Sequence, residues 1–325
     1  PMDFQLSDDQ EALRDGIRTF CEGRFAIDAL RELEEKTSFD RGLWSELAEM
    51  GVFALRLDES EGGVGLGLAD AVLVFAELGR RLIPGPVVWS HLLAGTIEGA
   101  ATGDAVVGGL SEVGDGPIVI EHLDHLDALV VLREDGVYRI DPKGLDGTPI
   151  ARPLDPLTPI HHVKSLPAGD KIGDATLAAT LQRDGAVLAS ALLFGIAEMT
   201  QELATEYAKG REQFGRPIGG FQAVKHILAD MFVRQELCRS IVYAAGATVD
   251  TPEVGSVSRA VAAAKLMAGE AALKNARACI QVHGGMGYTW EVPAHYYLKR
   301  TWVLENVFGG VEQHAEVMAD HLVTA

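Results

Sequence analysis

Two segments of the chain combine residue types that bind phosphate groups and flat rings. Residues 207–218 read YAKGREQFGRPI, and residues 281–288 read QVHGGMGY. The residues of interest in these segments are Arg211, Gln213, Phe214, Gln281, Gly284 and Gly285. Arginine forms charge-assisted, bidentate hydrogen bonds with phosphate oxygens, amide side chains add planar hydrogen bonds, and glycine lets a ligand approach the backbone closely. The two segments therefore predict contacts with the phosphates and a flat ring of a cofactor.

Each segment also has a simpler interpretation. An arginine at the end of a helix is often only a surface ion-pair partner. Glycines such as those of residues 284–287 are also typical of a helix C-cap. The two motifs occur in one chain, however, and their joint occurrence is more specific than either motif alone. We therefore favour the cofactor interpretation.

Metal binding has weaker support in the sequence. Imidazole and carboxylate groups suit zinc, and candidate ligands stand close together at Glu121-His122 with His125 and at His161-His162. No ligand spacing recurs among them, so we expect histidines in solvated turns and predict no metal site.

Two other kinds of site also lack their sequence patterns. No glycine-rich loop follows a strand and opens a helix, so neither a Rossmann nor a P-loop site is predicted. Ser90 and Ser111 are not in the setting of a nucleophile elbow.

The composition narrows the possible partners. The chain has 325 residues, of which 47% are hydrophobic, and this is enough to build globular cores. Its 47 acidic and 28 basic residues give a net charge of −19, which disfavours nucleic acid. No stretch of 18 or more apolar residues and no secretory signal pattern is present, so we expect no membrane span. The three cysteines are far apart and outside any CxxC, which predicts a reducing cytoplasm.

The elements that position these residues are expected to form three domains, mainly α with a small β domain. Residues 1–104 have apolar positions at spacings of three and four, and predict an N-terminal helical domain. Residues 105–175 contain short β-branched runs between turns, and predict a truncated middle β domain built as a compact sheet or half-barrel. Residues 176–325 carry long amphipathic patterns, and predict a C-terminal four-helix bundle.

Individual helices can be placed within these domains. Ser7 and Gln10 form a capping-box pattern that predicts a helix start. A single long helix is expected after Asp174. The other expected helices span residues 41–50, 68–81, 87–101, 221–247, 256–282, 294–304 and 312–322.

Four segments resemble the acyl-CoA dehydrogenase family. Residues 43–51 (LWSELAEMG), followed by the Gly62-Gly63 loop and ELGR at 77–80, are similar to its N-terminal domain. Residues 207–218 are similar to its C-terminal motif, which continues here into Phe221-Gln222 and LADM at 228–231. Residues 281–288 are similar to its second flavin-contacting motif. The resemblance is strong at both ends of the chain and weak from about 105 to 175.

The resemblance implies an FAD-dependent enzyme that acts on acyl-CoA. In the family, the residues that match Arg211, Gln213, Phe214, Gln281 and Gly285 reach across a subunit interface to a neighbour's FAD. The resemblance therefore implies that this chain donates half of a shared FAD site.

The family's catalytic glutamate is missing from both of its known positions. That glutamate abstracts the proton α to the thioester while hydride leaves the β carbon for the flavin. When Lys299-Arg300 is aligned with the family's Arg-Asp pair, one position holds Phe308. The other holds Gly185, with Asp184 beside it.

Other residues near these positions are weaker candidates. Glu305 lies one helical turn before Phe308 and is a candidate substitute base, although an exposed helical glutamate is the simpler interpretation. Glu291 and His295 are expected to orient their loop. The β domain is several tens of residues shorter than in the family. Only residues 110–114 (LSEVG) are similar to its flavin-covering loop, so this chain is not expected to hold a flavin ring alone.

Two functions follow from the resemblance. The first is a shortened subunit of an α2β2 acyl-CoA dehydrogenase, in which a fuller partner chain supplies the catalytic glutamate and an electron-transfer flavoprotein is the type of acceptor. Such shortened chains resemble those of actinobacterial steroid catabolism, which implies CoA thioesters of sterol side chains or ring fragments as substrates. The alternative is a non-catalytic scaffold that stabilises or regulates an acyl-CoA dehydrogenase partner. The presence of all the cofactor-facing residues favours the enzyme subunit.

Overall fold

The computed structural model of the chain describes residues 5–36, 38–111, 114 and 116–323. Glu112 and Val113 of the LSEVG segment lie outside the described residues. The α-helices are α1 (Asp8–Arg24), α2 (Ile27–Lys36), α3 (Arg41–Glu49), α4 (Leu68–Arg80), α5 (Val87–Leu92), α6 (Ala175–Gly210), α7 (Gln222–Asp250), α8 (Val257–His283), α9 (Ala294–Leu304) and α10 (Val311–Val323). The strands are β1 (Val107–Leu110), β2 (Ile118–Glu121), β3 (Ala128–Arg133), β4 (Gly136–Ile140), β5 (Gly147–Pro149), β6 (Ile160–Val163), β7 (Asp170–Asp174), β8 (Glu212–Gln213) and β9 (Arg216–Pro217).

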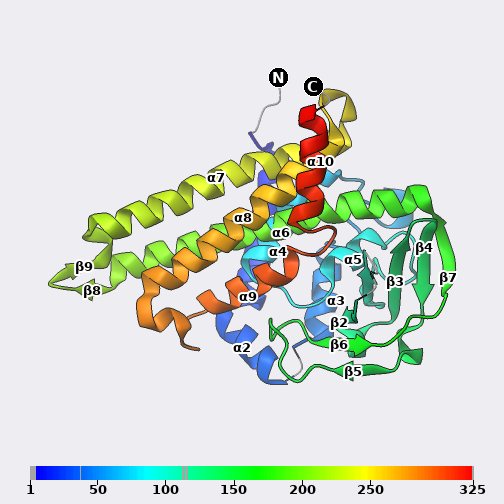
Figure 1. Ribbon diagram of the computed structural model, residues 1–325, viewed down its shortest axis with the longest axis horizontal. Helices are drawn as coiled ribbons and strands as arrows, with labels where there is room; N and C mark the ends of the chain where they lie inside the picture. Colours follow the sequence, from blue (N-terminus) through cyan, green and yellow to red (C-terminus); the bar gives the residue numbers. More distant parts are fainter. Residues whose placement is uncertain (1–4, 37, 112–113, 115, 324–325) are drawn as a thin grey trace.

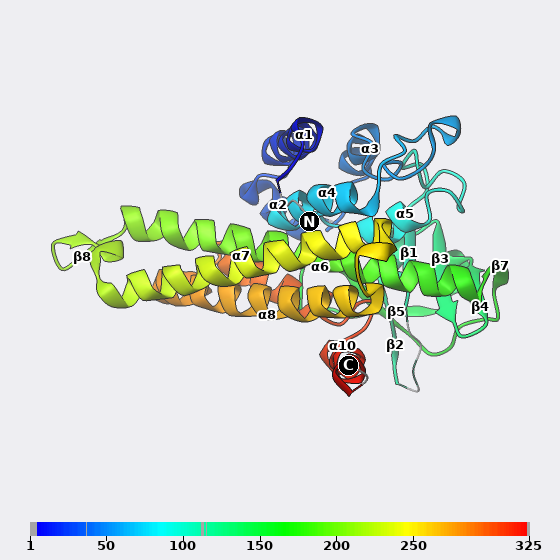
Figure 2. The same cartoon turned by 90° about the horizontal axis from the view of Figure 1, so that it is seen from above.

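The long helices α6, α7 and α8 lie side by side and form the body of the molecule (Figure 1). The shorter α9 and α10 pack against α8, and α4 packs against α6 and α7. The β strands, apart from β8 and β9, lie around the start of α6, at the opposite end of the molecule from the β8–β9 hairpin (Figure 2). This arrangement confirms the mainly α fold with a small β region.

The crossing of α4 and α6 depends on two glycines. A Cβ at Gly79 would lie 2.1 Å from the carbonyl oxygen of Leu192, and a Cβ at Gly195 would lie 2.0 Å from that of Ala76. Only glycine allows the two backbones to approach so closely. The crossing fixes α4 against the buried middle of α6.

A buried ionic network joins the same helices. Arg80 of α4 pairs with Glu77 at 3.4 Å, with Glu198 at 3.4 Å and with Glu202 at 2.5 Å, and Arg18 of α1 pairs with Glu77 at 2.7 Å. Arg80 and Glu77 are the charged residues of the ELGR segment. The segment therefore ties α4 to α1 through Glu77 and to α6 through Arg80, two charges that are themselves buried.

The helix α6 is the apolar centre of the fold. Among the described residues, only α6 has the length and hydropathy of a membrane-spanning helix. However, 78% of its apolar window is buried against the rest of the protein. Its composition therefore suits a core helix.

Several predicted elements are confirmed by the structure. Ser7 and Gln10 form the capping box, with both reciprocal hydrogen bonds at 3.2 Å. The single long helix after Asp174 is α6, and α7 to α10 begin and end within a few residues of the predicted bounds.

Two predictions about elements were wrong. The helix expected over 87–101 ends at Leu92, and the chain then follows turns in which Gly99 has a φ value of 81° and, beyond the predicted range, Gly103 one of 77°. These are left-handed conformations that an α-helix does not contain. The β region is not a single sheet: it forms a sheet in the order β1-β3-β4-β7 and a second sheet in the order β2-β6-β5.

Candidate functional site

The first candidate motif forms a tight hairpin at the end of α6. The strands β8 and β9 pair through Gln213 and Arg216, so that Phe214 and Gly215 make the turn. Their φ values are 52° and 78°, as a two-residue hairpin turn requires. A left-handed conformation costs a phenylalanine roughly 1–2 kcal/mol, yet the side chain of Phe214 is 92% exposed. The turn therefore presents an aromatic ring to the outside, where it gains little from the core of this chain.

The second motif lies at the same end of the molecule. Gln281 is exposed at the end of α8, and Gly284 caps the helix with φ 61° and ψ −137°. A Cβ at Gly284 or Gly285 would meet no atom within 4 Å, so their backbone faces open space. The ring of Tyr207 on α6 stacks on His283 with centroids 4.1 Å apart, which joins the two motifs.

The six predicted cofactor residues are all exposed. Among the described residues, the guanidinium of Arg211 has no hydrogen-bond or ion-pair partner, while the amide of Gln213 donates to the carbonyl of Glu212 at 2.8 Å. A free guanidinium, exposed amides and glycine backbone fit the phosphate and adenine half of FAD. Because these groups lie on the surface, they would hold that half on one side only.

Gly185 and Phe308, which the resemblance aligns with the two glutamate positions of the family, are in direct contact in this structure. Gly185 lies on α6, and Phe308 follows α9 with a φ of 54°. A Cβ at Gly185 would lie 2.3 Å from Cε1 of Phe308, and the Phe308 side chain is only 1% exposed. Its ring also packs against Trp89, with centroids 4.7 Å apart. The ring of Phe308 therefore fills the space beside Gly185.

The loop that carries Phe308 is held at several points. Lys265 of α8 donates from Nζ to the carbonyls of Glu305 at 3.0 Å and Gly309 at 2.8 Å. The amide of Phe308 donates to Oγ of Ser111 at 3.1 Å, and His314 Nε2 lies 3.1 Å from the Phe308 carbonyl. These contacts hold the left-handed conformation of Phe308 in place.

The acidic residues near the glutamate positions point elsewhere. Asp184 is buried and pairs with Arg56 at 2.9 Å and with Arg183 at 2.7 Å. Glu305 faces α8: its Cβ lies 3.9 Å from a Cβ built on Gly269. Burial raises the pKa of Glu305, opposed by the charges of Lys265 and Arg277 on α8. Glu305 lines neither of the cavities beside Phe308.

The loop that contains Glu291 and His295 lies next to the second motif. Glu291 is exposed. His295 packs between Trp290 and Tyr296, with centroids 4.8 and 4.3 Å away, and burial lowers the pKa of His295 to about 4. The packing of His295 supports a neutral, structural imidazole, and the orienting role of Glu291 stays a prediction.

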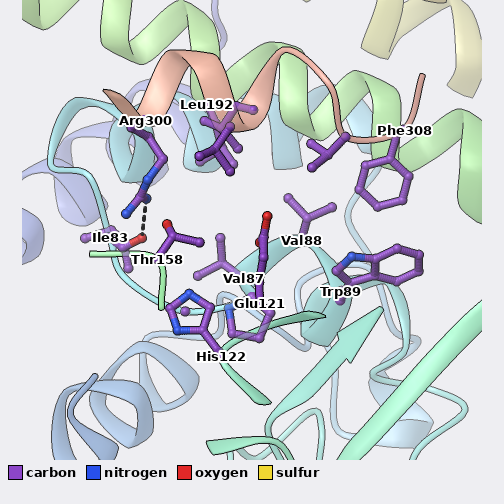
Figure 3. Close-up of a pocket in the computed structure, with 15 residues that line it drawn as sticks. Ile83, Val87, Val88, Trp89, Glu121, His122, Thr158, Leu192, Arg300 and Phe308 are labelled. Atoms are coloured by element: carbon purple, nitrogen blue, oxygen red, sulfur yellow. Dashed lines mark hydrogen bonds between the residues drawn. The ribbon is translucent and has the colours of Figure 1, made fainter. Parts of the chain in front are cut away.

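The sequence interpretation missed one carboxyl group near Phe308. Glu121, at the end of β2, lines a cavity of about 50 Å³ together with Phe308, and its side chain points towards the apolar wall that contains Val88 (Figure 3). Burial raises the pKa of Glu121 to about 7. In the sequence Glu121 stood out only as a doubtful metal ligand. One sequence signal could have pointed to it: Glu121 directly follows the apolar run at residues 118–120.

The remaining candidates have structural surroundings. Within the described ranges, no three His, Cys, Asp or Glu side chains gather in a way that could hold a metal ion. His161 Nε2 lies 3.3 Å from a carboxylate oxygen of Asp124. The hydroxyl of Ser90 accepts from the amide of Val107 at 3.0 Å and donates to its carbonyl.

Comparisons with known proteins define the class of this chain. Residues 7–104 match the model of the acyl-CoA dehydrogenase N-terminal domain, and residues 177–323 match that of the C-terminal domain. The acyl-CoA dehydrogenase IpdE2 of Mycobacterium tuberculosis is 33% identical over 304 residues, which cover 90% of this chain and 91% of that protein. The chain belongs to the acyl-CoA dehydrogenase family, whose members bind FAD.

Solved structures agree with this membership. A chain in the ChsE4-ChsE5 complex from Mycobacterium tuberculosis is 25% identical, with a TM-score of 0.88 over 100% of both chains. A variant of a steroid acyl-CoA dehydrogenase has the same fold, with a TM-score of 0.83, 24% identity and 98% of both chains covered.

Proposed function

We propose that this chain is a subunit of a heteromeric FAD-dependent acyl-CoA dehydrogenase in which a partner chain carries the catalytic glutamate. The observation that carries the proposal is the contact of Phe308 with Gly185: both positions of the family's base lack a carboxylate, and the space between them is filled. The chain keeps the cofactor motifs while lacking the base. This combination suits a subunit that completes a neighbour's site.

In this proposal the chain binds the distant half of a shared FAD. Arg211 would neutralise the diphosphate, Gln213 and Gln281 would hydrogen-bond the cofactor, and Gly284 and Gly285 would let it approach the end of α8. When bound, FAD would accept the hydride that leaves the β carbon of the thioester. Phe308 would exclude substrate and water from this chain's own glutamate positions.

Exposed apolar side chains support an assembly with a second chain. Phe232, Val233 and Leu237 of α7 are between 51% and 55% exposed, and Phe214 and Tyr288 are 92% and 80% exposed. The last two lie on the cofactor motifs. Large exposed apolar groups of this kind mark interaction surfaces. A similar chain occurs in a complex named for two components, ChsE4 and ChsE5.

The same proposal extends to the assembly, the electron acceptor and the substrate. We propose an α2β2 assembly in the cytoplasm, with an electron-transfer flavoprotein type of acceptor. The proposed substrate is a CoA thioester of a sterol side chain or ring fragment. It is supported by the resemblance to shortened chains of steroid catabolism.

Flavin content tests the proposal. The chain should be purified alone and together with an acyl-CoA dehydrogenase encoded beside it, and FAD per chain measured. We expect little FAD in the chain alone and stoichiometric FAD in the complex. Arg211→Ala should weaken FAD binding in the complex by roughly 10- to 100-fold, because a charge-assisted contact is lost. Arg211→Lys should restore only part of it, since lysine lacks the fork.

The matched control is Arg259, an exposed arginine near the start of α8 and therefore at the other end of that helix. Arg259→Ala should leave FAD binding unchanged. A lone chain that binds stoichiometric FAD, or an Arg211→Ala complex with unchanged FAD affinity, would contradict the proposal.

A further inference from the structure

The hairpin at the end of α6 carries a second arginine besides Arg211. Arg216 lies on β9, beyond the ends of α6 and α7 (Figure 1), and its side chain is exposed. Its Cζ lies 4.1 Å from the centroid of the Phe221 ring, which is a cation–π contact. The ring of Phe221 is half-buried and also meets Phe214 edge to face, with centroids 6.2 Å apart. Phe221 therefore holds the guanidinium of Arg216 in place at the surface.

Arg216 shares one face of the hairpin with Arg211 and Gln213. Gln213 is directly opposite Arg216 in the two-stranded ladder, and directly opposed side chains lie on the same side of a sheet. Arg211, just before β8, has extended backbone angles, and its carbonyl accepts from the amide of Ile218 at 2.8 Å, so the ladder continues through it. Because successive side chains alternate between the two sides, Arg211 lies on the same face as Gln213. Two guanidinium groups and an amide are thus on one side of the hairpin.

The charge of Arg216 is not paired within the chain. Among the described residues, Arg216 forms no hydrogen bond and no ion pair. Glu212 lies on the opposite face of the hairpin, because it alternates with its neighbours, and Glu206 pairs with Lys209 at 2.6 Å. The first turn of α7, which follows Phe221, contains no acidic residue. In a chain with a net charge of −19, this face therefore keeps two arginines free for an anion from outside the chain.

The residue types on this face select the ligand. The planar fork of arginine binds phosphate oxygens through two hydrogen bonds. A diphosphate carries its charge on two phosphate groups, so it can use two arginines where a monophosphate uses one. The Phe221 ring already restricts the Arg216 side chain, and less conformational entropy is lost when the anion binds.

We propose that Arg216, positioned by the ring of Phe221, binds the diphosphate of the shared FAD together with Arg211. This inference rests on the proposed function and adds to it a residue that selects the diphosphate. Phe221 acts only through Arg216. A surface cation–π contact without this role would stabilise the hairpin but would not distinguish phosphate groups from the rest of the cofactor.

Ligand binding to the flavin-free complex of this chain with its partner tests the inference. Dissociation constants of FAD, ADP and adenosine should be measured by calorimetry. We expect Arg216→Ala to weaken the binding of FAD and ADP by roughly tenfold, because a charge-assisted contact is lost. The affinity for adenosine, which has no phosphate, should not change. Arg259→Ala, which changes an exposed arginine at the other end of α8, should leave all three affinities unchanged.

A double variant tests the positioning role of Phe221. Phe221→Leu keeps an apolar side chain but removes the ring, so the Arg216 guanidinium is no longer held. Arg216→Ala should therefore weaken FAD binding less in the Phe221→Leu background than in the wild type. Equal losses in the two backgrounds would overturn the role of Phe221.

The remaining outcomes separate this inference from the proposed function. Unchanged FAD affinity in Arg216→Ala, together with the expected loss in Arg211→Ala, would overturn the role of Arg216 and leave the proposed function standing. Equal losses for ADP and adenosine would also overturn it, because Arg216 would then only support the shape of the hairpin. Unchanged FAD affinity in both variants would contradict the proposed function as well. If Arg216→Ala prevents assembly of the complex, Arg216→Gln, which removes the charge and keeps a polar side chain, gives the same comparison of ADP with adenosine.

Discussion

The phenyl ring of Phe308 occupies the space into which a side chain at Gly185 would project. A Cβ at Gly185 would lie 2.3 Å from Cε1 of that ring, closer than any real contact. The two residues are 123 positions apart in the sequence (308 − 185), and the resemblance to the family predicts that they stand at its two glutamate positions. Each residue therefore depends on the other: the small residue makes room for the large one.

This dependence predicts that Gly185→Ala destabilises the chain. The added methyl group must displace a buried ring, which typically costs about 1–3 kcal/mol of unfolding free energy. The measurement is chemical denaturation followed by circular dichroism. Gly16→Ala is the matched control, because Gly16 is an exposed glycine of α1 with open space around it. That change should be neutral or stabilise by roughly 0.5–1 kcal/mol. Equal effects of the two changes would show that the ring does not fill the space at Gly185.

The position of Glu305 predicts that it is not the catalytic base. Glu305→Gln keeps the size and removes the charge, and we expect less than a tenfold loss of turnover in the assembled complex. A positioned general base would contribute roughly two to four decades. The same assay, with one CoA thioester and one artificial electron acceptor, should be run on a partner chain whose candidate glutamate is changed to glutamine. Collapse of activity in the first complex and survival in the second would reverse the assignment.

The exposed hairpin predicts a separation of stability from cofactor binding. Phe214→Gly removes a side chain that is 92% exposed and relieves its left-handed conformation, so the isolated chain should unfold at the same free energy or up to about 1 kcal/mol higher. The complex should bind FAD more weakly. Val254→Ala, an exposed position beyond the other end of α7, should change neither quantity. A loss of stability without a loss of FAD affinity would make Phe214 a structural residue.

Lys265 predicts a pH dependence of stability. Burial lowers the pKa of Lys265 to about 8, below its ordinary value of 10.5. Between these values the unfolded chain binds more protons, so the contribution of Lys265 to stability rises with pH, by at most about 3 kcal/mol. Compared with Lys265→Met, the wild type should therefore gain unfolding free energy between pH 7.5 and pH 10.

The control for this measurement is Lys274→Met, which changes a half-exposed lysine on the same helix. The difference between this variant and the wild type should stay constant over the same pH range. A constant difference for Lys265→Met as well would mean that the amine of Lys265 is not held in a low-dielectric site.

Local sequence patterns determined much of the fold. The capping box at Ser7, the long amphipathic periods of α6 to α8, and the motif that became the β8–β9 hairpin all depend on residues a few positions apart. Hydrogen bonds and apolar faces at such spacings act within one element, so they can be inferred without the tertiary structure. The resemblance to the family also predicts that Gly185 and Phe308 stand at its two glutamate positions.

Only the tertiary structure decided how distant residues meet. The contact between Gly185 and Phe308 depends on how the side-chain volumes of two distant segments fit together. The spacing of apolar residues along the sequence does not predict such a contact. The same is true of Glu121, whose burial depends on helices far along the chain, and of Glu305, which faces α8 rather than the cavity. A residue's pKa and its access to a pocket depend on packing and local dielectric, which exist only once the elements are assembled.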